Sequence, residues 1–420
     1  MKFRGSYAVV GNTLTAWGYY PYLSSFGAAP YGSVAGNAAT NVGNRNLKWE
    51  TNKKLNVGGD FSFFNRFSLT VDYYKNNNDQ LIFDVPTPPS LGLPGTNASN
   101  VITKNIGTMV NKGWEFSVTG DIIHQRDFTW NVNVNFTTQN NVVKNLFDST
   151  KEVIVTGPNN GTFNILRVGE PVNSLYGYRY AGVNSANGNP MWYKADGSLV
   201  QYNVATGPAA GYYVVVKPGD PTLGAKTALG AADRTVLGSP IPTYYGGFTN
   251  TFTYKGFGLD VFFRFQGGNK VYNLTAQEVL FGQGFLNNGK GILDRWTPTH
   301  TNTQVPKLLY GGDNNINLSS QANSRFLEDG DFLRLQNITL SYNFSKPLLE
   351  RATKGVVKNL RVYFQGQNLA IWTKYKGIDP EATAGTVISG TTVPIEIDLG
   401  IDNSSVPMLR TFTAGLSIIF

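Results

Sequence analysis

The sequence predicts an all-β fold: an antiparallel transmembrane β-barrel portion of about ten long strands, with short periplasmic turns and long extracellular loops. Three observations lead to this prediction. Apolar and polar residues alternate with a period of two in runs along the whole chain, as in strands with one apolar face. Short and long connections alternate between the runs. The chain ends on an aromatic residue, Phe420, which closes such a run.

The candidate strands follow one another from the first residues to the last. The first contains Phe3, Tyr7 and Val9. The later runs occupy residues 54–63, 67–74, 114–122, 128–136, 248–254, 257–265, 338–344, 360–367 and 411–420. Each run has about ten residues, the length that a tilted strand needs to cross a bilayer core.

The two faces of these strands differ in chemistry. The polar faces are largely Asn, Thr, Ser and Asp, which would leave unpaired groups in a dry core. We therefore expect the apolar faces to point outward to lipid and the polar faces to point into a lumen. The positions that test this expectation are Phe61, Val71, Phe116, Val134, Val261 and Leu340.

The connections predict the topology. Short ones are expected at 65–66, 124–126 and 255–256, with a longer one at 345–357. Long ones are expected at 11–50, 76–112, 140–242, 267–331 and 371–409. Transmembrane barrels segregate short periplasmic turns from long external loops in this way. Strand direction requires 140–242 to add zero or two crossings, and we interpret its strand-like segment, 175–183, as part of a folded external excursion. A short helix is expected within 272–281.

Composition narrows the class of protein. No stretch approaches 18 apolar residues, so a transmembrane helix is not expected. The 26 Phe, 22 Tyr and 7 Trp are sufficient for aromatic girdles at both interfaces. Cysteine is absent, which excludes disulfides and thiol catalysis. The net charge of +8 is scattered, so no nucleic-acid partner is expected.

The sequence contains no catalytic constellation, and we expect neither an enzyme nor a cofactor. His124 lies in a predicted turn and His300 in a predicted loop, and neither has a partner histidine at metal-ligand spacing. The acidic segments 195–198 and 328–331 lack the spaced carboxylates of a calcium loop. No metal site is therefore predicted, and both histidines are expected to be solvated.

Aromatic residues in the long loops are the only indication of a ligand. Flat rings bury the apolar faces of sugars while their polar tips stay hydrogen-bonded. The candidates are Trp17, Tyr19 and Tyr20 in the first loop and Trp192, Tyr193, Tyr212 and Tyr213 in the third. Packing within the loops or membership of the external girdle is the alternative role for these residues.

Several segments, taken in order, carry a family resemblance. They are Asn46-Leu-Lys-Trp-Glu-Thr51, Asp60-Phe-Ser-Phe-Phe-Asn65, Val71-Asp-Tyr-Tyr74, Asn111-Lys-Gly-Trp-Glu-Phe116, Leu175-Tyr-Gly-Tyr178, Asp233-Arg-Thr-Val-Leu-Gly-Ser-Pro240, Phe326-Leu-Glu-Asp-Gly-Asp-Phe-Leu-Arg-Leu335, Asn359-Leu-Arg-Val-Tyr-Phe-Gln-Gly-Gln-Asn-Leu369, Tyr375-Lys-Gly-Ile-Asp-Pro380 and Arg410-Thr-Phe412. The ordered series resembles the C-terminal half of SusC/RagA-type TonB-linked outer-membrane proteins, which are TonB-dependent transporters.

The resemblance implies that residues 1–420 are the C-terminal part of a 22-stranded barrel in the outer membrane of a Gram-negative bacterium. The plug domain, the TonB box and the signal peptide are expected upstream, because Met1 is followed at once by strand-like sequence. The implied function is active import of oligosaccharides or peptides, energised through TonB. A passive channel or structural barrel and a soluble β-rich carbohydrate-binding protein are the alternatives.

The resemblance also implies partners. A SusD-like surface lipoprotein is expected as a lid on the external loops, and contact with it is a further possible role of the loop aromatics. The barrel-assembly machinery is expected to read the end of the last strand in the presence of outer-membrane lipid. The residues of this assembly signal are Phe412, Leu416, Ile418 and Phe420.

Overall fold

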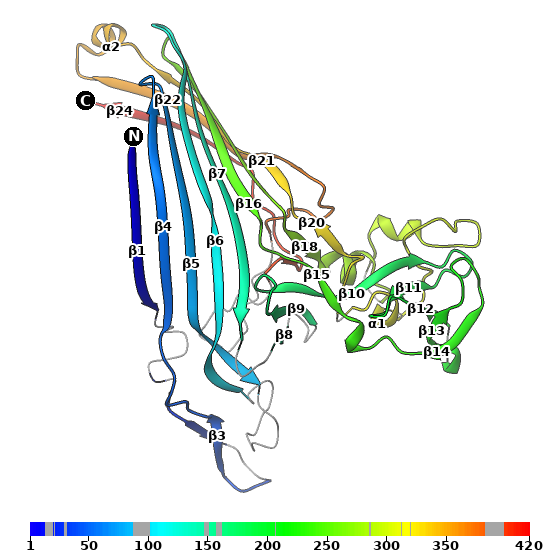
Figure 1. Ribbon diagram of the computed structural model, residues 1–420. Helices are drawn as coiled ribbons and strands as arrows, with labels where there is room; N and C mark the ends of the chain where they lie inside the picture. The colour runs from blue at the N-terminus through cyan, green and yellow to red at the C-terminus, as the bar shows by residue number, and fades with distance from the viewer. Residues whose placement is uncertain are drawn as a thin grey trace.

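A computed structural model describes residues 1–12, 20, 22–28, 32–86, 101–146, 151–156, 162–205, 207–284, 287–311, 313–319, 321–382 and 399–420. Its largest feature is a ten-stranded sheet, which we call the wall, in which the strands follow chain order (Figure 1). The strands of the wall are β1 (Lys2–Asn12), β4 (Glu50–Phe63), β5 (Phe67–Pro86), β6 (Val101–His124), β7 (Phe128–Asn145), β16 (Tyr244–Tyr254), β17 (Phe257–Gly267), β21 (Phe332–Asn343), β22 (Asn359–Thr373) and β24 (Thr411–Ile419). Every neighbouring pair is antiparallel. The predicted fold class and strand number are confirmed.

Short connections gather at one end of the wall, uppermost in Figure 1, and both chain ends lie toward that end. The β16–β17 turn has φ of 44° at Lys255 and 92° at Gly256, and the β4–β5 turn has φ of 56° at Phe64 and 53° at Asn65. Positive φ at both central residues is the geometry of a tight hairpin turn that matches strand twist. The fourth short connection contains helix α2 (Lys346–Thr353). The predicted short turns are confirmed.

The segment between β7 and β16 adds no crossing to the wall. β7 pairs directly with β16, with Val134 opposite Phe248 and Phe136 opposite Gly246. Of the two possibilities left open by the sequence, zero or two crossings within 140–242, the structure shows zero. The segment 175–183 lies in a separate sheet outside the wall, as strand β10 (Ser174–Val183).

The β5–β6 hairpin extends far beyond the expected bilayer span. β6 has 24 residues, or about 80 Å at 3.3 Å per residue, against an apolar core of about 30 Å. The prediction of a loop over all of 76–112 is therefore wrong at both of its ends. The Asn-rich ends of these strands stay extended because each pairs with its neighbour, as Asn76 does with Asn111, so the ladder overrides weak strand propensity.

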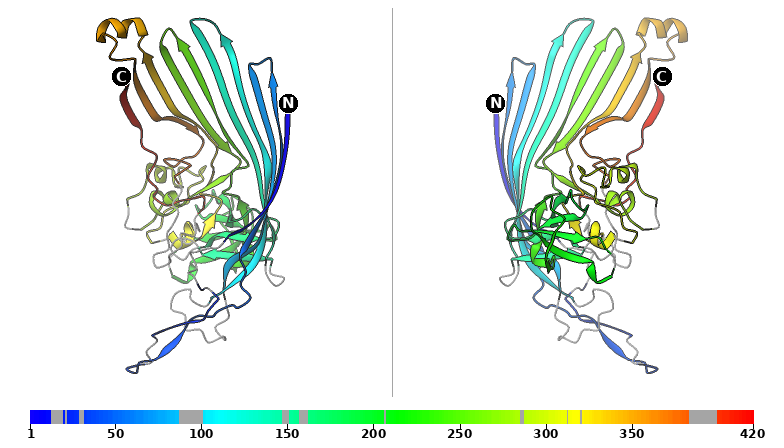
Figure 2. Two further views of the ribbon diagram at one scale, coloured as in Figure 1. Left: turned by 90° about the vertical axis from the view of Figure 1, so that its left-hand side faces the viewer. Right: turned by 90° about the vertical axis from the view of Figure 1, so that its right-hand side faces the viewer.

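The wall is an open sheet. Among the described residues, β1 pairs only with β4, and β24 pairs only with β22. Figure 2 shows these two edge strands on opposite sides of the curved wall. Hydrogen bonding between the first and last strands, which would have made the chain a small closed barrel, does not occur in this structure.

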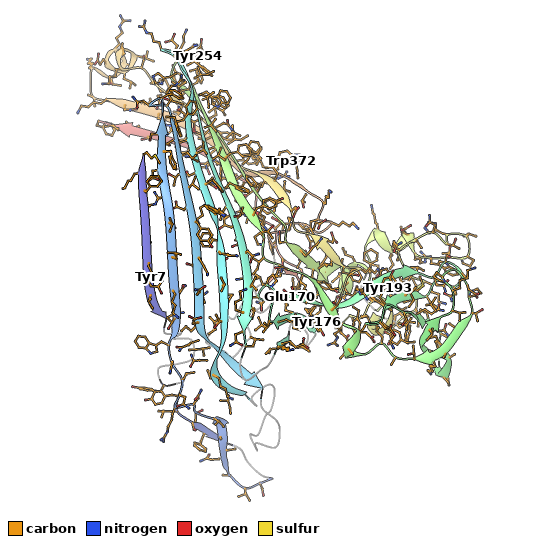
Figure 3. All side chains as sticks on the ribbon, in the orientation of Figure 1. Tyr7, Glu170, Tyr176, Tyr193, Tyr254 and Trp372 are labelled. Carbon is orange, nitrogen blue, oxygen red and sulfur yellow. The ribbon has the colours of Figure 1, made fainter. Side chains whose placement is uncertain are left out.

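Apolar side chains form continuous rows across one face of the wall, which we call the outer face. One row crosses six strands, because each of its residues lies directly opposite the next: Phe61, Leu69, Val118, Val134, Phe248 and Phe263. None of the six test positions is buried, and Leu340 is 50% exposed. Exposed apolar rows on a sheet of this length are the pattern of a lipid-facing surface. In Figure 3, Tyr254 lies at the short-turn end of the wall and Tyr7 on its first strand.

Three long connections fold together at the other end of the wall. We call their described residues within 151–243, 268–331 and 399–402 the external subdomain. Its larger sheet contains β8 (Glu152–Thr156), β9 (Thr162–Arg167), β10, β11 (Pro190–Tyr193), β12 (Leu199–Asn203), β13 (Gly211–Val215), β14 (Leu223–Thr227), β15 (Thr235–Gly238) and β19 (Ala322–Asn323). A smaller sheet contains β18 (Lys270–Asn273), β20 (Leu327–Asp329) and β23 (Ile401–Asp402). A separate hairpin, β2 (Ser25–Ala28) and β3 (Asn37–Asn41), lies in the first long connection.

The external subdomain has its own hydrophobic core, which draws on all three connections. Phe163 and Leu175, from the segment 151–243, pack with Tyr272 from 268–331 and with Ile401 from 399–402. All four side chains are fully buried. The connections predicted as separate loops therefore form one packed unit.

The remaining elements are short. They are η4 (Gly207–Ala209), η5 (Ala231–Asp233), the π-helical turn η6 (Ala276–Leu280), η7 (Lys290–Asp294) and α1 (Asp313–Ile316). The helix expected within 272–281 is thus present only in its second half, because residues up to Asn273 belong to β18. No helix in the described ranges has the length and apolar character needed to cross a membrane.

Candidate functional site: the inner face and the external subdomain

The second face of the wall, which we call the inner face, is polar. One of its rows runs from Asp60 through Thr70, Ser117, Asn135, Gly247 and Arg264 to Arg334. Strand alternation places this row on the opposite side of the sheet from the apolar rows. Any ligand that passes along this face meets charged, hydroxyl and amide groups.

A first ion cluster lies near the β1 edge of the inner face. Arg4 Nη1 donates to Asp60 Oδ2 at 2.5 Å, and the same guanidinium pairs with Asp72. Thr70 Oγ1 donates to Asp60 Oδ1 at 2.9 Å. Arg4 and Asp60 are each about one third exposed. Solvent weakens an ion pair at such positions, so this pair adds little to the free energy of unfolding and serves mainly to position the edge strand β1.

A second ion cluster lies where the chain returns to the inner face after β22, and all of its side chains are buried except that of Arg264. It consists of Arg264 on β17, Arg334 on β21, and Asp379 and Glu381 on the following segment. Arg334 Nη2 donates to Asp379 Oδ1 at 2.6 Å, and its Nε donates to Glu381 Oε2 at 2.9 Å. Arg264 also pairs with Glu381. The pairs fasten residues 379–381 to the inner face of β17 and β21.

A polar pocket of about 440 Å³ lies on the inner face between the two clusters and the external end of the wall. Its hydrogen-bonding side chains come from six strands: Ser6, Lys54, Asn56, Tyr74, Asn76, Asn111, Glu115, Gln139 and Tyr245. The buried Oδ1 atom of Asn111 accepts no hydrogen bond from any described residue. Clefts of this size that offer a few convergent polar groups are typical ligand sites.

The chemistry available in this pocket is binding chemistry. Tyr74, Asn56 and Gln139 offer hydroxyl and amide groups, and Glu115 offers a carboxylate. The pocket-lining residues include no histidine and so do not form a serine–histidine or carboxylate–histidine arrangement. Among the residues described, no three His, Asp or Glu side chains lie close enough to hold a metal ion.

Both histidines lie in exposed positions, each beside a carboxylate. His300 Nε2 lies 2.8 Å from Asp294 Oδ1, and this hydrogen bond, helped by one from Thr303, lowers the pKa of the Asp294 carboxyl. His124 Nδ1 lies 3.6 Å from Asp121 Oδ2 in the β6–β7 turn. Both rings are substantially exposed, at 48% and 70%. The expectation that both histidines are solvated is confirmed, and each also has a carboxylate neighbour.

The loop aromatics have different environments. Trp17 and Tyr19 lie outside the described residues. Tyr20 is 65% exposed, beside the ring of Tyr22. Trp192 is fully buried and packs edge-on against Tyr180, with ring centroids 5.0 Å apart.

The other three candidates lie on β11 and β13 of the external subdomain, which are separated by β12. Tyr193 is partly exposed under the guanidinium of Arg179 (Figure 3). Tyr212 packs against the core residue Tyr202. Tyr213 is partly exposed, and its hydroxyl donates to the Ala209 carbonyl at 3.2 Å. Tyr20, Tyr193 and Tyr213 are therefore accessible, whereas Trp192 in this structure is a core residue.

The last strand presents its apolar residues on the outer face. Phe412, Leu416 and Phe420 are 63%, 64% and 71% exposed, and Ile418 is 39% exposed. The ring of Phe412 stacks on Phe364 of β22 at a centroid distance of 6.1 Å. The proposed assembly signal is therefore an accessible row at the wall edge.

Comparison with known proteins places the chain in a family. The family model described as TonB dependent receptor-like, β-barrel, matches residues 1–279. The chain belongs to this family. TonB-dependent receptor P3 of Formosa agariphila is 32% identical over 429 residues, covering 100% of this chain and 39% of the relative. SusC of Bacteroides thetaiotaomicron is 29% identical over 390 residues, covering 90% of this chain and 32% of SusC.

The structure resembles a solved member of the same class. A chain of the RagAB peptide transporter matches with a TM-score of 0.75 and 26% identity, over 99% of this chain and 40% of that one. The predicted SusC/RagA-type resemblance is confirmed. The chain spans two fifths or less of the length of these relatives. They are named as receptors and transporters, in agreement with the expectation that the chain is not an enzyme.

The sequence alone did not reveal the inner-face pocket or the second ion cluster. The pocket is built by register, which brings Tyr74, Gln139 and Tyr245 together from three strands. Arg334 and Asp379 are 45 residues apart, so no local spacing links them. The family motif that ends at Asp379-Pro380 drew attention to the segment after β22, but it did not indicate that Asp379 pairs with Arg334.

Proposed function

We propose that the chain is the C-terminal part of the barrel of an outer-membrane importer that takes up oligosaccharides or peptides with energy supplied through TonB. The observation that carries the proposal is the match of 99% of the chain, wall and external subdomain alike, to a RagAB peptide transporter chain. The sequence relationship to TonB-dependent receptor P3, which covers all of this chain and 39% of the relative, supports it independently.

In this proposal the inner face forms part of the substrate path. Tyr74, Glu115, Gln139 and Tyr245 in the pocket offer the donors and acceptors that sugar hydroxyls and peptide amides require. Tyr20, Tyr193 and Tyr213 remain candidate contacts on the external side, and Trp17 and Tyr19 remain candidates on sequence grounds. A SusD-like surface lipoprotein would cover the external subdomain, and TonB would act through a region upstream.

The open wall requires partner strands. Two unpaired edges would expose backbone groups that cannot rest in hydrocarbon, so we propose that β1 continues into further strands of a larger barrel and that β24 closes it. The barrel-assembly machinery would read the outward row that ends at Phe420. The sequence has no cysteine, so engineered cysteine pairs in the full-length protein test this directly.

We expect no disulfide between cysteines placed at Phe3 or Tyr7 and cysteines placed at Phe412 or Leu416, because other strands would separate β1 from β24. The matched control is Val362→Cys with Leu416→Cys, which are register partners on β22 and β24 and are expected to cross-link. Efficient cross-linking of the β1 and β24 positions would contradict the larger barrel.

The substrate class is tested by uptake. A deletion strain that carries the full-length gene, or the same gene with Tyr74→Phe, Glu115→Gln and Tyr245→Ala, is given labelled oligosaccharides or labelled peptides. We expect uptake of one class only, reduced in the variant at unchanged outer-membrane level. Equal uptake with and without the gene for both classes would refute the importer.

A further inference from the structure

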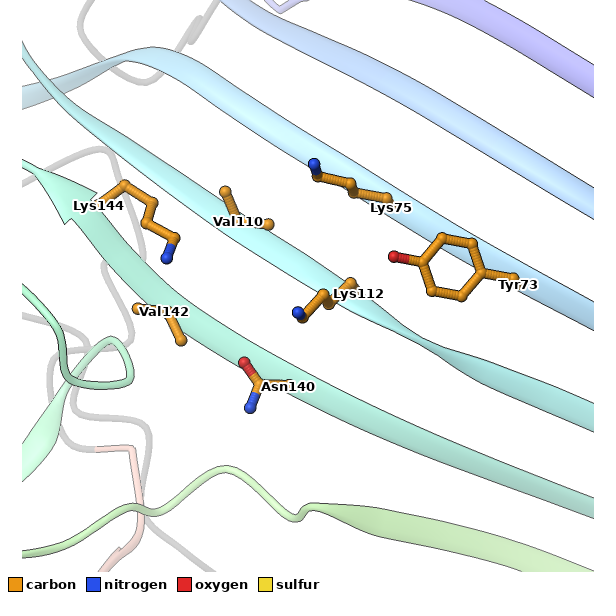
Figure 4. Close-up of a pocket in the computed structure, with 7 residues that line it drawn as sticks. All are labelled: Tyr73, Lys75, Val110, Lys112, Asn140, Val142 and Lys144. Atoms are coloured by element: carbon orange, nitrogen blue, oxygen red, sulfur yellow. The ribbon is translucent and has the colours of Figure 1, made fainter.

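Three lysines from neighbouring strands lie together on the outer face, on the opposite side of the wall from the proposed substrate path. Lys75 on β5 lies opposite Lys112 on β6, which lies opposite Asn140 on β7. Lys75 also lies opposite Leu55, a residue of the outer face. These side chains and Lys144 line a shallow pocket of about 210 Å³ with Tyr73, Val110 and Val142 (Figure 4).

The position along the strands places the lysines just beyond the apolar band. On β5 the outward residues from Phe67 to Tyr73 are apolar or aromatic, and Lys75 is the next one toward the external end. Tyr73 lies opposite Trp114, with ring centroids 5.1 Å apart. Tyr and Trp on a lipid-facing surface mark the level of the headgroups. The lysine ammonium groups therefore lie at the depth of lipid phosphates.

The charges of the three lysines are uncompensated by protein. Within the described part of the chain, none of Lys75, Lys112 and Lys144 has a carboxylate within 4.0 Å. Lys53 on the neighbouring strand β4, by contrast, has a carboxylate partner, because its Nζ lies 2.8 Å from Asp79 Oδ2. Like charges directly opposite on paired strands repel, so Lys75 and Lys112 favour an anion that lies between them.

We propose that Lys75, Lys112 and Lys144 form a binding site for the phosphate groups of an anionic lipid of the outer leaflet. The ammonium groups bind phosphate as point charges, and the Tyr73 ring, on the bilayer side of Lys75, packs beside the apolar part of the lipid. The site rests on the proposed membrane location, but it is on the other side of the wall from the substrate path and takes no part in import.

The test uses the full-length protein in phosphatidylcholine nanodiscs with or without bisphosphorylated lipid A. Lipid A affinity is measured for the wild type, for the triple Lys75→Ala/Lys112→Ala/Lys144→Ala variant, and for a triple Arg variant that keeps the charge. Lys53→Ala is the matched control, because it removes a lysine that is already paired. Heat-modifiable gel mobility confirms that each variant is assembled, and single Lys112→Gln replaces the triple variant if assembly fails.

We expect affinity to fall about fivefold for each lysine replaced by alanine, with little change for the Arg variant and for Lys53→Ala. Unchanged lipid A affinity in an assembled alanine variant would overturn the site. Equally tight binding of inorganic phosphate would overturn the assignment to lipid. Normal lipid A binding by a protein that imports nothing would refute the proposed importer and leave the lipid site standing.

Discussion

Arg334 and Asp379 form a buried ion pair, with 2.6 Å between Nη2 and Oδ1 and only 4% of each side chain exposed. Arg334 belongs to the inner face of the wall, and Asp379 belongs to the segment that follows β22. With Glu381 and Arg264, the pair holds this returning segment against the strands. Among the described residues Arg334 is the only ion-pair partner of Asp379, so loss of Arg334 leaves the Asp379 carboxylate buried without compensation.

Arg334→Ala is expected to destabilise the full-length protein by about 3–5 kcal/mol, the usual cost of breaking a buried ion pair. The apparent free energy of unfolding, followed in urea by heat-modifiable gel mobility, measures this. Arg167→Ala is the control, because Arg167 pairs with a half-exposed Glu152 and is expected to change stability by about 1 kcal/mol or less. Equal effects of the two substitutions would show that the buried pair has no special role.

The wall could be predicted from the sequence because its signal is local. The alternation of Phe61 and Phe63 with their polar neighbours is visible within ten residues. The dipeptide Lys255-Gly256 predicts the turn of its hairpin. The length of β5 and β6 could not be predicted, since Asn76 and its neighbours have weak strand propensity and are held by pairing across the hairpin.

The external subdomain could not be predicted for a different reason. Its sheets use strands as short as Ile401–Asp402, which pairs in parallel with Tyr272 and Asn273 from another connection. Such pairings depend on contacts between distant segments and leave no period in the sequence. For the same reason Trp192, a core residue, and Tyr20, an exposed one, looked alike among the loop aromatics.

Replacing Trp192 by alanine is expected to destabilise the external subdomain by about 3–5 kcal/mol, because the change opens a cavity in a fully buried site. Tyr213→Ala, at a partly exposed position, is expected to cost about 1 kcal/mol or less. Protease resistance of surface-exposed protein on whole cells measures both.

If Tyr213 contacts substrate, Tyr213→Ala lowers substrate affinity while the amount of protein in the outer membrane stays the same. A Trp192→Ala protein that is fully stable and loses only affinity would contradict the assignment of Trp192 to the core.

The environment of Tyr180 makes the stability of the external subdomain depend on pH. Its hydroxyl donates to the Gln304 carbonyl at 2.9 Å, and burial raises the pKa of Tyr180 to about 12, against an opposing effect of Arg325. A raised pKa means that the folded state holds the proton more tightly than the unfolded chain, whose tyrosine pKa is about 10. This contribution is complete below about pH 10 and is lost as the pH rises through about 12.

Tyr180→Phe is therefore expected to be less stable than the wild type by about 1 kcal/mol at neutral pH, because it loses a hydrogen bond. The gap should shrink between about pH 10 and 12, since phenylalanine does not ionise. Near-ultraviolet circular dichroism during urea unfolding at several pH values measures the gap, and a constant gap across that range would contradict the prediction.

Deletion of Phe420, or its change to Asp, is expected to reduce the amount of assembled barrel and increase periplasmic degradation of the full-length protein. Phe420 is 71% exposed at the end of the outward row of β24, where the assembly machinery can reach it. Molecules that do assemble should keep their substrate specificity. Leu348→Asp, at an exposed position of α2, is the control, and normal assembly of the Phe420 deletion would show that the terminal aromatic is incidental.

If the wall belongs to an active importer, substrate uptake must depend on TonB, and uptake in paired strains with and without TonB measures this dependence. Both strains carry the full-length protein at equal outer-membrane level, and accumulation of the labelled substrate identified by the uptake screen is followed over time. We predict that accumulation against a concentration gradient occurs only with TonB, since an occluded barrel needs energy to pass its substrate. Uptake at the same rate in both strains would exclude TonB-driven import and identify a passive channel.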